Sequence, residues 1–514
     1  MGKQSFVQGA FILVIASVIV KAMGFCYQII IIRLIGTEGI GIFNMVYPIY
    51  TAAIVMTTAG LPLALTKFVA EELARNKKQT AEKILGMAVF VLTVLSTCGA
   101  FLLIISSPFL IRKIYADPRV IPAFLILIPT ILLIAIASAI RGYFQGTQDM
   151  RPTAFTQLVE QVIRFTSGVV LVYLLYPAGL TWAVVGLASA IFLSELGGLL
   201  FLLHLYRKSP RTQQLLVRPT FPIVKKLLCF GIPVTITRIV TTLVSAVEAS
   251  LIPYQLIKAG NTLSEAASFY GELTGVAFTL LMIPSTLSFS LSTTLVPAIS
   301  EALSKNQRVL LGKRTADAVG ITILAGAPWA IILFFWGSSY AELLFKVSQA
   351  GEILRILALG SVFLYLSQTT SGILQGIGYV KMNFTTTLIG GLLRLSGIYY
   401  LGSRPLLGPT TIAAAYVISF VSIALLNLLI IKIKTGLLLE GGFFIRLFLA
   451  ALLFYVLLQW ISPYVTHNLL LLFLVTVGLI IIFFFTLLVT GDKYSALFLQ
   501  QLLKSAKKYF PPGS

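Results

Sequence analysis

Apolar segments of about 20 residues recur along the whole chain and limit its possible folds more than any other feature. A helix of that length crosses the roughly 30 Å of hydrocarbon in a bilayer. Hydrophobic residues make up 58% of the 514 residues and charged residues only 11%, whereas soluble domains contain about 25% charged residues. The sequence therefore predicts an all-α integral membrane protein.

The apolar segments predict about fourteen transmembrane helices, separated by short polar connections. The expected bounds are 6–33, 40–65, 84–108, 120–140, 153–176, 180–205, 223–253, 272–298, 315–337, 353–373, 383–402, 409–431, 443–461 and 468–490. The first segment is longer than the apolar core of a signal peptide, and no small-residue cleavage pattern follows it. We therefore expect it to be retained.

The distribution of cations predicts how the chain is oriented. With the N-terminus in the cytoplasm, Lys and Arg collect in the cytoplasmic connections at 67–83, 207–226, 305–314 and 504–508. This is the usual positive-inside bias of membrane proteins. We expect the protein in the cell membrane, with both termini on the cytoplasmic side. The chain has a net charge of +21, and we expect its basic connections to contact anionic membrane lipids. No nucleic acid partner is expected.

A weak internal repeat relates the two halves of the chain. AIRGYFQGTQDMRPTAFTQLVEQVIR at 139–164 aligns with TTSGILQGIGYVKMNFTTTLIGGLLR at 369–394, at an offset of 230 residues. The same offset aligns VAEELARN at 69–76 with ISEALSKN at 299–306. One constant shift over this length predicts two parallel six-helix repeats, an arrangement that supports alternating access to a site between the halves.

The repeat predicts the domain organisation. We expect an N-terminal six-helix lobe at 1–205, a basic cytoplasmic linker at 206–222 and a C-terminal six-helix lobe at 223–432. Two further transmembrane helices and a basic cytoplasmic tail occupy 433–514.

Seven charged residues fall well inside the expected spans. They are Lys21, Glu160, Arg164, Glu195, Arg238, Glu248 and Arg394. Each would cost about 2.5–3.5 kcal/mol if it faced lipid, so these side chains should face protein, water or a ligand. Four cations against three acids favour an anionic substrate.

Several pairings of these charges are open. Glu160 and Arg164 are four residues apart and can pair on one helix. The two acids Glu160 and Glu195 serve either structural pairing or ion coupling. Lys21 has no acid near it on its own helix, where Gln28 is the nearest strongly polar residue. It either faces a cavity and a ligand or pairs with another helix.

The sequence gives no pattern for catalysis, metal binding or a cofactor. The three cysteines, Cys26, Cys98 and Cys229, lie far apart, and His204 and His467 stand alone. We find no phosphate-binding loop and no nucleophile motif. We therefore expect no enzyme activity, no metal and no cofactor.

Three motifs together resemble one known family. K-x-x-G-F at 21–25, RGYFQGTQDMRP at 141–152 and YGELTGVAFTLLMIPSTLSFSLSTTLVPAISEAL at 270–303 look like the stage V sporulation protein B family. That family is a polysaccharide-transporter branch of the superfamily of MATE drug exporters and lipid II flippases. The resemblance implies MATE-like lobes and a flippase that carries a peptidoglycan precursor such as lipid II to the outer leaflet for spore cortex synthesis.

The resemblance also implies the substrate and its contacts. The substrate would be a glycan linked to a polyprenyl diphosphate, and wall-synthesis enzymes are possible partners. Lys21 matches a cavity-facing cation of related flippases, and Arg238 is similar to another. Where some of them carry a second cation and then an acid, this chain has Tyr27 and Gln28. The two C-terminal helices would form a groove for the lipid tail.

Together, the charges inside the spans and the resemblance predict a central cavity that binds the substrate. Its expected substrate-binding residues are Lys21, Arg238, Arg164, Arg394, Gln28 and Glu248. Two other classes of function remain open. A MATE-type multidrug or cation antiporter would need an acid-lined cavity and usually twelve spans, and a non-transporting membrane scaffold for wall synthesis would tolerate charge reversal at Lys21.

Overall fold

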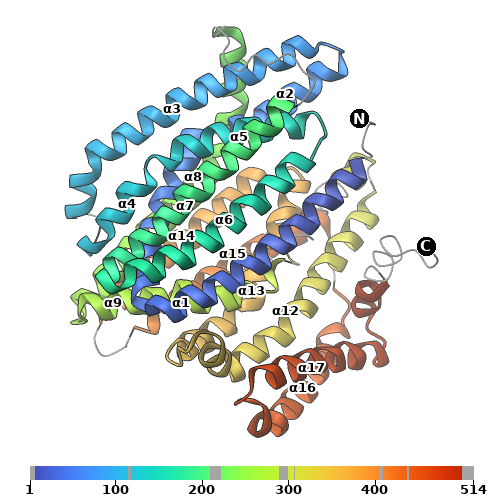
Figure 1. Cartoon of the computed structure of the whole chain (residues 1–514). Coiled ribbons are helices and arrows are strands. Elements are labelled where there is room, and N and C mark those ends of the chain that lie inside the picture. The colour runs from blue at the N-terminus through green and yellow to red at the C-terminus, as the bar shows by residue number, and fades with distance from the viewer. Residues whose placement is uncertain are drawn as a thin grey trace. The chain divides into compact units, whose positions relative to one another are not determined.

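The chain is built from long helices in the computed structural model (Figure 1). The structure describes residues 6–113, 115, 117–208, 221–286, 288, 299–305, 307–404, 409–436 and 439–500. These residues form helices joined by short turns, without a strand among them. Contacts divide the chain into two compact units, Met1–Gly271 (unit 1) and Glu272–Ser514 (unit 2).

Unit 1 contains helices α1 to α9. Their bounds are α1 Phe6–Thr58, α2 Leu61–Ala74, α3 Lys78–Lys113, η1 Pro118–Val120, α4 Ile121–Leu127, α5 Thr130–Gly146, α6 Arg151–Leu175, η2 Tyr176–Ala178, α7 Leu180–Lys208, α8 Phe221–Lys258 and α9 Leu263–Gly271. Buried aliphatic side chains of α2, α3, α5 and α7 form a common core, which includes Leu65, Leu85, Ile140 and Leu202. Helix α1 packs against α6, α8 and α9.

A single glycine divides α1 into two helices. Gly36 has φ 72° and ψ −179°, a conformation that is essentially restricted to glycine because a Cβ would clash with the backbone. The break falls between the expected spans 6–33 and 40–65. The first two spans are therefore separate helices joined by a one-residue turn.

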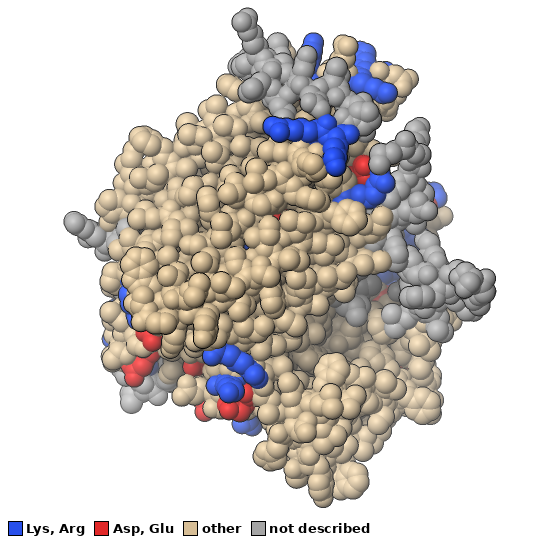
Figure 2. Space-filling model, viewed as in Figure 1, with Lys and Arg blue, Asp and Glu red and all other residues tan. Residues whose placement is uncertain are grey.

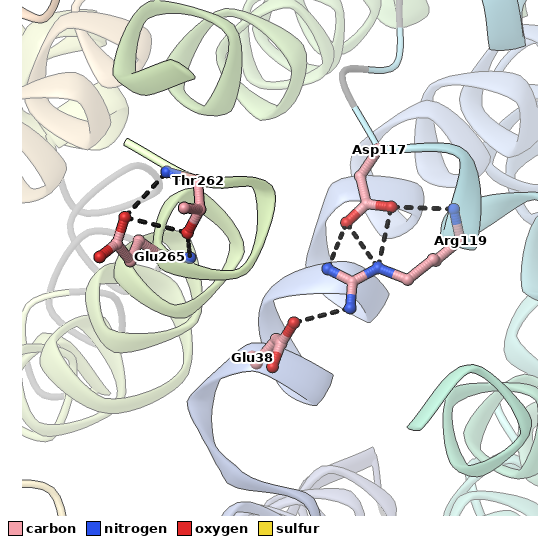
Figure 3. Close-up of polar contacts among 5 residues, drawn as sticks. All are labelled: Glu38, Asp117, Arg119, Thr262 and Glu265. Carbon is pink, nitrogen blue, oxygen red and sulfur yellow. Dashed lines mark hydrogen bonds and ion pairs between the residues drawn. The ribbon is translucent and has the colours of Figure 1, made fainter. Parts of the chain in front are cut away.

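An arginine fixes the chain just after this turn (Figure 3). Arg119 Nη1 lies 2.6 Å from Glu38 Oε1, and the Nε and Nη2 atoms of Arg119 donate to the carboxylate of Asp117 at 2.7 to 3.1 Å. Asp117 also accepts the backbone N–H of Arg119 and so begins helix η1. These contacts connect the start of the second half of α1 to η1.

Unit 2 contains a π-helical turn and seven α-helices whose bounds follow, and its described residues 299–304 and 493–500 are helical as well. Their bounds are η3 Glu272–Ala277, α10 Phe278–Leu281, α12 Arg308–Phe345, α13 Ala350–Gly376, α14 Val380–Leu401, α15 Thr411–Thr435, α16 Phe443–Val465 and α17 Leu469–Val489. Buried residues of α12, α13 and α15, among them Val319, Ile373 and Ile431, form its core.

The two last helices are attached to α12 by side-chain hydrogen bonds. Trp336 Nε1 donates to Ser462 Oγ of α16 at 3.1 Å. The Tyr340 hydroxyl lies 2.6 Å from Thr476 Oγ1 of α17. Helices α16 and α17 also pack along each other as an antiparallel pair.

Eleven helical segments of the described residues are long and apolar enough to cross a membrane. They include twelve of the fourteen expected spans, because the segment Ile15–Ala74 holds the first two. The expected span 383–402 forms α14 but is not among the eleven, and the expected span 272–298 lies partly outside the described residues. On the face drawn in Figure 2, charged side chains gather in patches beside a wide area of uncharged ones. The chain is an all-helical membrane protein, and the number fourteen stays a prediction.

Candidate functional site

Most of the expected site residues lie in unit 1. Lys21 and Gln28 are on α1, Glu160 and Arg164 on α6, Glu195 on α7, and Arg238 and Glu248 on α8. Arg394 lies in unit 2 on α14, where its guanidinium carbon is 4.9 Å from the centre of the Tyr416 ring. The geometry below concerns unit 1.

Two ion pairs join α5, α6 and α7 inside the unit. Arg141 on α5 lies 3.4 Å from each carboxylate oxygen of Glu160. Arg164 Nη2 donates to Glu195 Oε1 at 2.9 Å, and its Nε donates to Ser194 Oγ at 3.3 Å. Glu160 and Glu195 are each only 8% exposed. Arg141, Glu160, Arg164 and Glu195 are called the ionic quartet below.

The quartet is paired differently from the sequence expectation. Glu160 and Arg164 can pair along α6, but each is instead paired with a neighbouring helix. The partly buried guanidinium of Arg164 has donors in several directions, and α7 offers both a carboxylate and a hydroxyl on adjacent residues. Pairing across helices therefore satisfies more donors than pairing along one helix.

Arg141 was absent from the sequence-based candidates. The signal that identifies it is the short connection between α5 and α6, residues 147–150, which makes the two helices antiparallel neighbours. A cation near the end of α5 and an acid in the first half of α6 then lie within reach of each other.

A glycine on α7 makes room for the carboxylate of Glu160. A Cβ atom built at Gly198 would collide with Cγ and Oε1 of Glu160. Any larger residue at this position would push Glu160 away from α7. The sequence thus provides both the charges of the quartet and the space in which they meet.

Helix α1 brings the Lys21–Gln28 segment alongside α6 (Figure 1). The Tyr27 ring packs against Gly168, and its centre lies 5.9 Å from that of Phe165. Gly24 faces the Gln161 side chain. The Lys21 side chain is exposed and lies one helical turn before Gly24, while Gln28 is partly buried.

Helix α8 carries two of the expected site residues, an exposed cation and a buried acid. The Arg238 side chain is exposed, and its guanidinium has no ion-pair partner among the described residues. Glu248 is 5% exposed and lies about 15 Å further along the helix, at 1.5 Å per residue. Helix α8 packs along α1, the helix of Lys21.

The described part of the chain contains no cluster of three or more His, Cys, Asp or Glu side chains that could hold a metal ion. The expected site residues of unit 1 and Arg141 are instead arginines, a lysine, a glutamine and glutamates, placed singly or in pairs on helices. Such groups can bind and neutralise an ionic ligand by electrostatic pairing.

Comparisons with protein families identify the chain's relatives. The polysaccharide biosynthesis protein family model matches residues 6–303, and the MatE family model matches residues 273–400. Stage V sporulation protein B of Bacillus subtilis is 32% identical over 435 residues, which cover 83% of each chain. The lipid II flippase MurJ of the same organism is 25% identical and covers 76% of each chain.

Solved structures agree on the fold. The lipid II flippase MurJ in an inward closed conformation has a TM-score of 0.70 at 16% identity and covers 96% of this chain and 100% of its own. An inward-facing MATE-family transporter has a TM-score of 0.71 at 16% identity and covers 81% of this chain and 94% of its own. Two of these similar proteins are named as a lipid II flippase and a MATE-family transporter. The chain belongs to the polysaccharide biosynthesis protein family, in the branch of stage V sporulation protein B.

Proposed function

We propose that the chain is a flippase that moves a lipid-linked oligosaccharide from the cytoplasmic to the outer leaflet by alternating access. The substrate would be a peptidoglycan precursor such as lipid II, used for spore cortex synthesis. The relatives named stage V sporulation protein B and lipid II flippase MurJ support this choice.

The observation that carries the proposal is the charge balance among the expected site residues of unit 1 and Arg141. The ionic quartet is neutral because each arginine is matched by a glutamate. Lys21, Arg238 and Glu248 then leave one net positive charge, and Arg238 is exposed without an acidic partner among the described residues. A positive surplus at membrane depth suits an anionic ligand.

The energetics of a diphosphate fit this arrangement. A polyprenyl diphosphate carries about two negative charges, and pairing with Arg and Lys offsets the loss of hydration as these charges cross. A membrane potential that is negative inside favours their outward movement by about 2.3 kcal/mol per charge per 100 mV. The potential alone would thus supply a driving force.

The proposal assigns separate roles to the charged residues. Lys21 and Arg238 contact the diphosphate, with Gln28, Glu248, Arg164 and Arg394 around the cavity. Glu160 and Glu195 have structural roles, because both carboxylates are already held by arginines. Ion coupling through these two acids is the competing assignment.

The proposed architecture follows from the sequence repeat. Two parallel six-helix lobes at 1–205 and 223–432, joined by the linker 206–222, would rock about the site. Residues 433–514 would add two transmembrane helices that form a groove for the lipid tail, giving fourteen in all. Both termini would face the cytoplasm.

A MATE-type antiporter is the second candidate, because the MatE model matches residues 273–400 and a MATE transporter shares the fold. It predicts efflux of cationic dyes driven by a proton or sodium gradient. If the chain is a non-transporting scaffold for wall synthesis, it should neither translocate a lipid-linked oligosaccharide nor export cationic dyes.

The test uses the purified protein in vesicles with fluorescent lipid-linked muropeptide, with and without an imposed potential. We expect translocation by the native protein and a loss of at least about tenfold, equivalent to 1.4 kcal/mol, in Lys21→Gln and Arg238→Gln. Lys258→Gln, an exposed cation at the end of the same helix α8, is the matched control and should retain activity. No translocation by the native protein, or full activity of both variants, would refute the proposal.

A further inference from the structure

A cationic cavity in unit 2 lies outside the site proposed above. It has a volume of about 590 Å³ and is formed by the start of α12, the end of α15 and the residues that follow α17. Its charged side chains are Arg308, Lys313, Lys434, Lys493 and Glu440. Four cations against one acid make it a site for negative charge.

The cations of this cavity are only partly neutralised. Lys493 Nζ lies 3.6 Å from Asp317 and 3.5 Å from Glu440. Neither Arg308 nor Lys313 forms an ion pair in the described part of the chain. These two side chains are exposed and line the same cavity, so they can contact one ligand together.

An apolar cavity of about 470 Å³ adjoins the cationic one. It is lined by α12, α13 and α15, by Leu439 and by Phe444 of α16, and its one charged residue is Lys432. Leu425, Leu429 and Phe444 are more than half exposed, so the apolar cavity opens at the surface between apolar side chains of α15 and α16, two helices apolar enough to cross a membrane. A lipid chain can enter it without leaving the bilayer.

The chain itself shows that the two cavities meet. Lys432 lines the apolar cavity, whereas the next residues, 433–436, line the cationic one. In the same way, Leu439 lines the apolar cavity and the next residue, Glu440, lines the cationic one. The start of α12, the end of α15 and the start of α16 lie on one side of the membrane, because α12 to α17 alternate in direction between short connections.

We propose that the two cavities together bind one anionic phospholipid from the surrounding leaflet. The phosphate would lie between Arg308 and Lys313 in the cationic cavity, and an acyl chain would lie in the apolar cavity. Guanidinium and ammonium groups are the usual partners of lipid phosphates at a membrane surface. The proposal does not depend on the transport function, because the diphosphate contacts proposed above, Lys21 and Arg238, line neither cavity. Leu439, Glu440, Phe444 and Lys493 do belong to the segment 433–514 that is proposed to hold the lipid tail, so the third test below separates the two ligands.

The first test measures lipid binding to the full-length protein by native mass spectrometry and by thermal stability in detergent. Phosphatidylglycerol and phosphatidylcholine of the same chain length are added separately. We expect phosphatidylglycerol to remain bound at least about tenfold more often and to raise the melting temperature more. Equal retention of the two lipids would overturn the proposal.

The second test places the site. The double variant Arg308→Gln/Lys313→Gln should lose the preference for phosphatidylglycerol. Lys305→Gln/Lys381→Gln removes two exposed cations from the same side of unit 2, outside both cavities, and should keep it. A preference that survives the first variant, or that both variants abolish equally, would refute this location.

The third test separates a lipid from free phosphate and from the proposed substrate. Inorganic phosphate at millimolar concentration should not reproduce the stabilisation. A polyprenyl diphosphate should not displace phosphatidylglycerol from the native protein at equal concentration. Full stabilisation by phosphate alone would reduce the site to an inorganic anion site, and displacement by polyprenyl diphosphate would assign it to the substrate.

Discussion

Arg164 Nη2 of α6 lies 2.9 Å from Glu195 Oε1 of α7, and this ion pair replaces the one that Arg164 could form along its own helix. The first prediction follows from it. Glu195→Ala leaves a largely buried guanidinium without its carboxylate, and we expect the free energy of unfolding to fall by about 2–3 kcal/mol. Thermal or denaturant unfolding of the purified protein in detergent measures this loss.

The control for this pair is the double variant Arg164→Leu/Glu195→Leu. Replacing both charges removes the desolvation cost along with the attraction, so it should be less destabilising than Glu195→Ala. A double variant that is as unstable as the single one would show that the pair itself, rather than an orphaned charge, determines stability.

Gly198 should tolerate no added side chain. In Gly198→Ala the new Cβ meets the carboxylate of Glu160, so that carboxylate must shift from the position in which it pairs with Arg141. We expect a loss of about 1–3 kcal/mol in stability. Gly478→Ala in α17 is the matched control, because nothing lies within 4 Å of a Cβ there, and it should be neutral or slightly stabilising. Equal melting temperatures for the two variants would contradict the packing described for Gly198.

Gly36→Ala tests the strain of the local backbone, because the added methyl group would meet no other part of the structure. A Cβ at Gly36 has nothing within 4 Å, so the effect comes from the conformation at φ 72° and ψ −179°. We expect a loss of about 1–3 kcal/mol. Gly441→Ala also adds a Cβ in open space, but without a positive φ, and should be near neutral. If both variants melt alike, the helix break is not at residue 36.

The hydroxyl of Thr476 should contribute to the attachment of α17. Thr476→Val removes the partner of the buried Tyr340 hydroxyl with almost no change in volume. We expect a loss of about 1–3 kcal/mol, measured by unfolding in detergent. Thr486→Val on the same helix changes an exposed hydroxyl that bonds only to the backbone of Ile482, and should have little effect.

A capping contact predicts one pH dependence (Figure 3). Glu265 Oε2 accepts hydrogen bonds from the backbone N–H and the hydroxyl of Thr262 at the start of α9. These hydrogen bonds, chiefly the one from the backbone N–H, lower the pKa of Glu265. The contribution to stability is therefore complete above the unfolded pKa of about 4.3 and is lost as the pH falls through the lower folded pKa.

The measurement compares Glu265→Gln with the native protein between pH 3 and pH 6. Glutamine keeps an acceptor at the cap but does not titrate. We expect the native protein to lose its advantage in melting temperature toward the acidic end. A constant difference across this range would contradict the assignment.

The sequence predicted the helices well because each apolar segment contains its own signal. Residues 34–39, with Gly36 and the polar residues that follow it, separate the first two apolar segments, and the division of α1 falls among them. Pairing was not predictable in the same way. The partners of Glu160 and Arg164 depend on which helices are neighbours, and Arg141 acquires its role only when α5 and α6 are folded side by side.

The one-residue turn inside α1 has a mechanical consequence for Lys21. At 1.5 Å per residue, the helix between Lys21 and Gly36 forms a lever arm of about 22 Å. A rotation of about ten degrees in the two dihedrals of that glycine would swing the ammonium group through about 4 Å, more than the length of a hydrogen bond. A small torsional change at one joint is thus enough to make or break any contact at the other end of the arm.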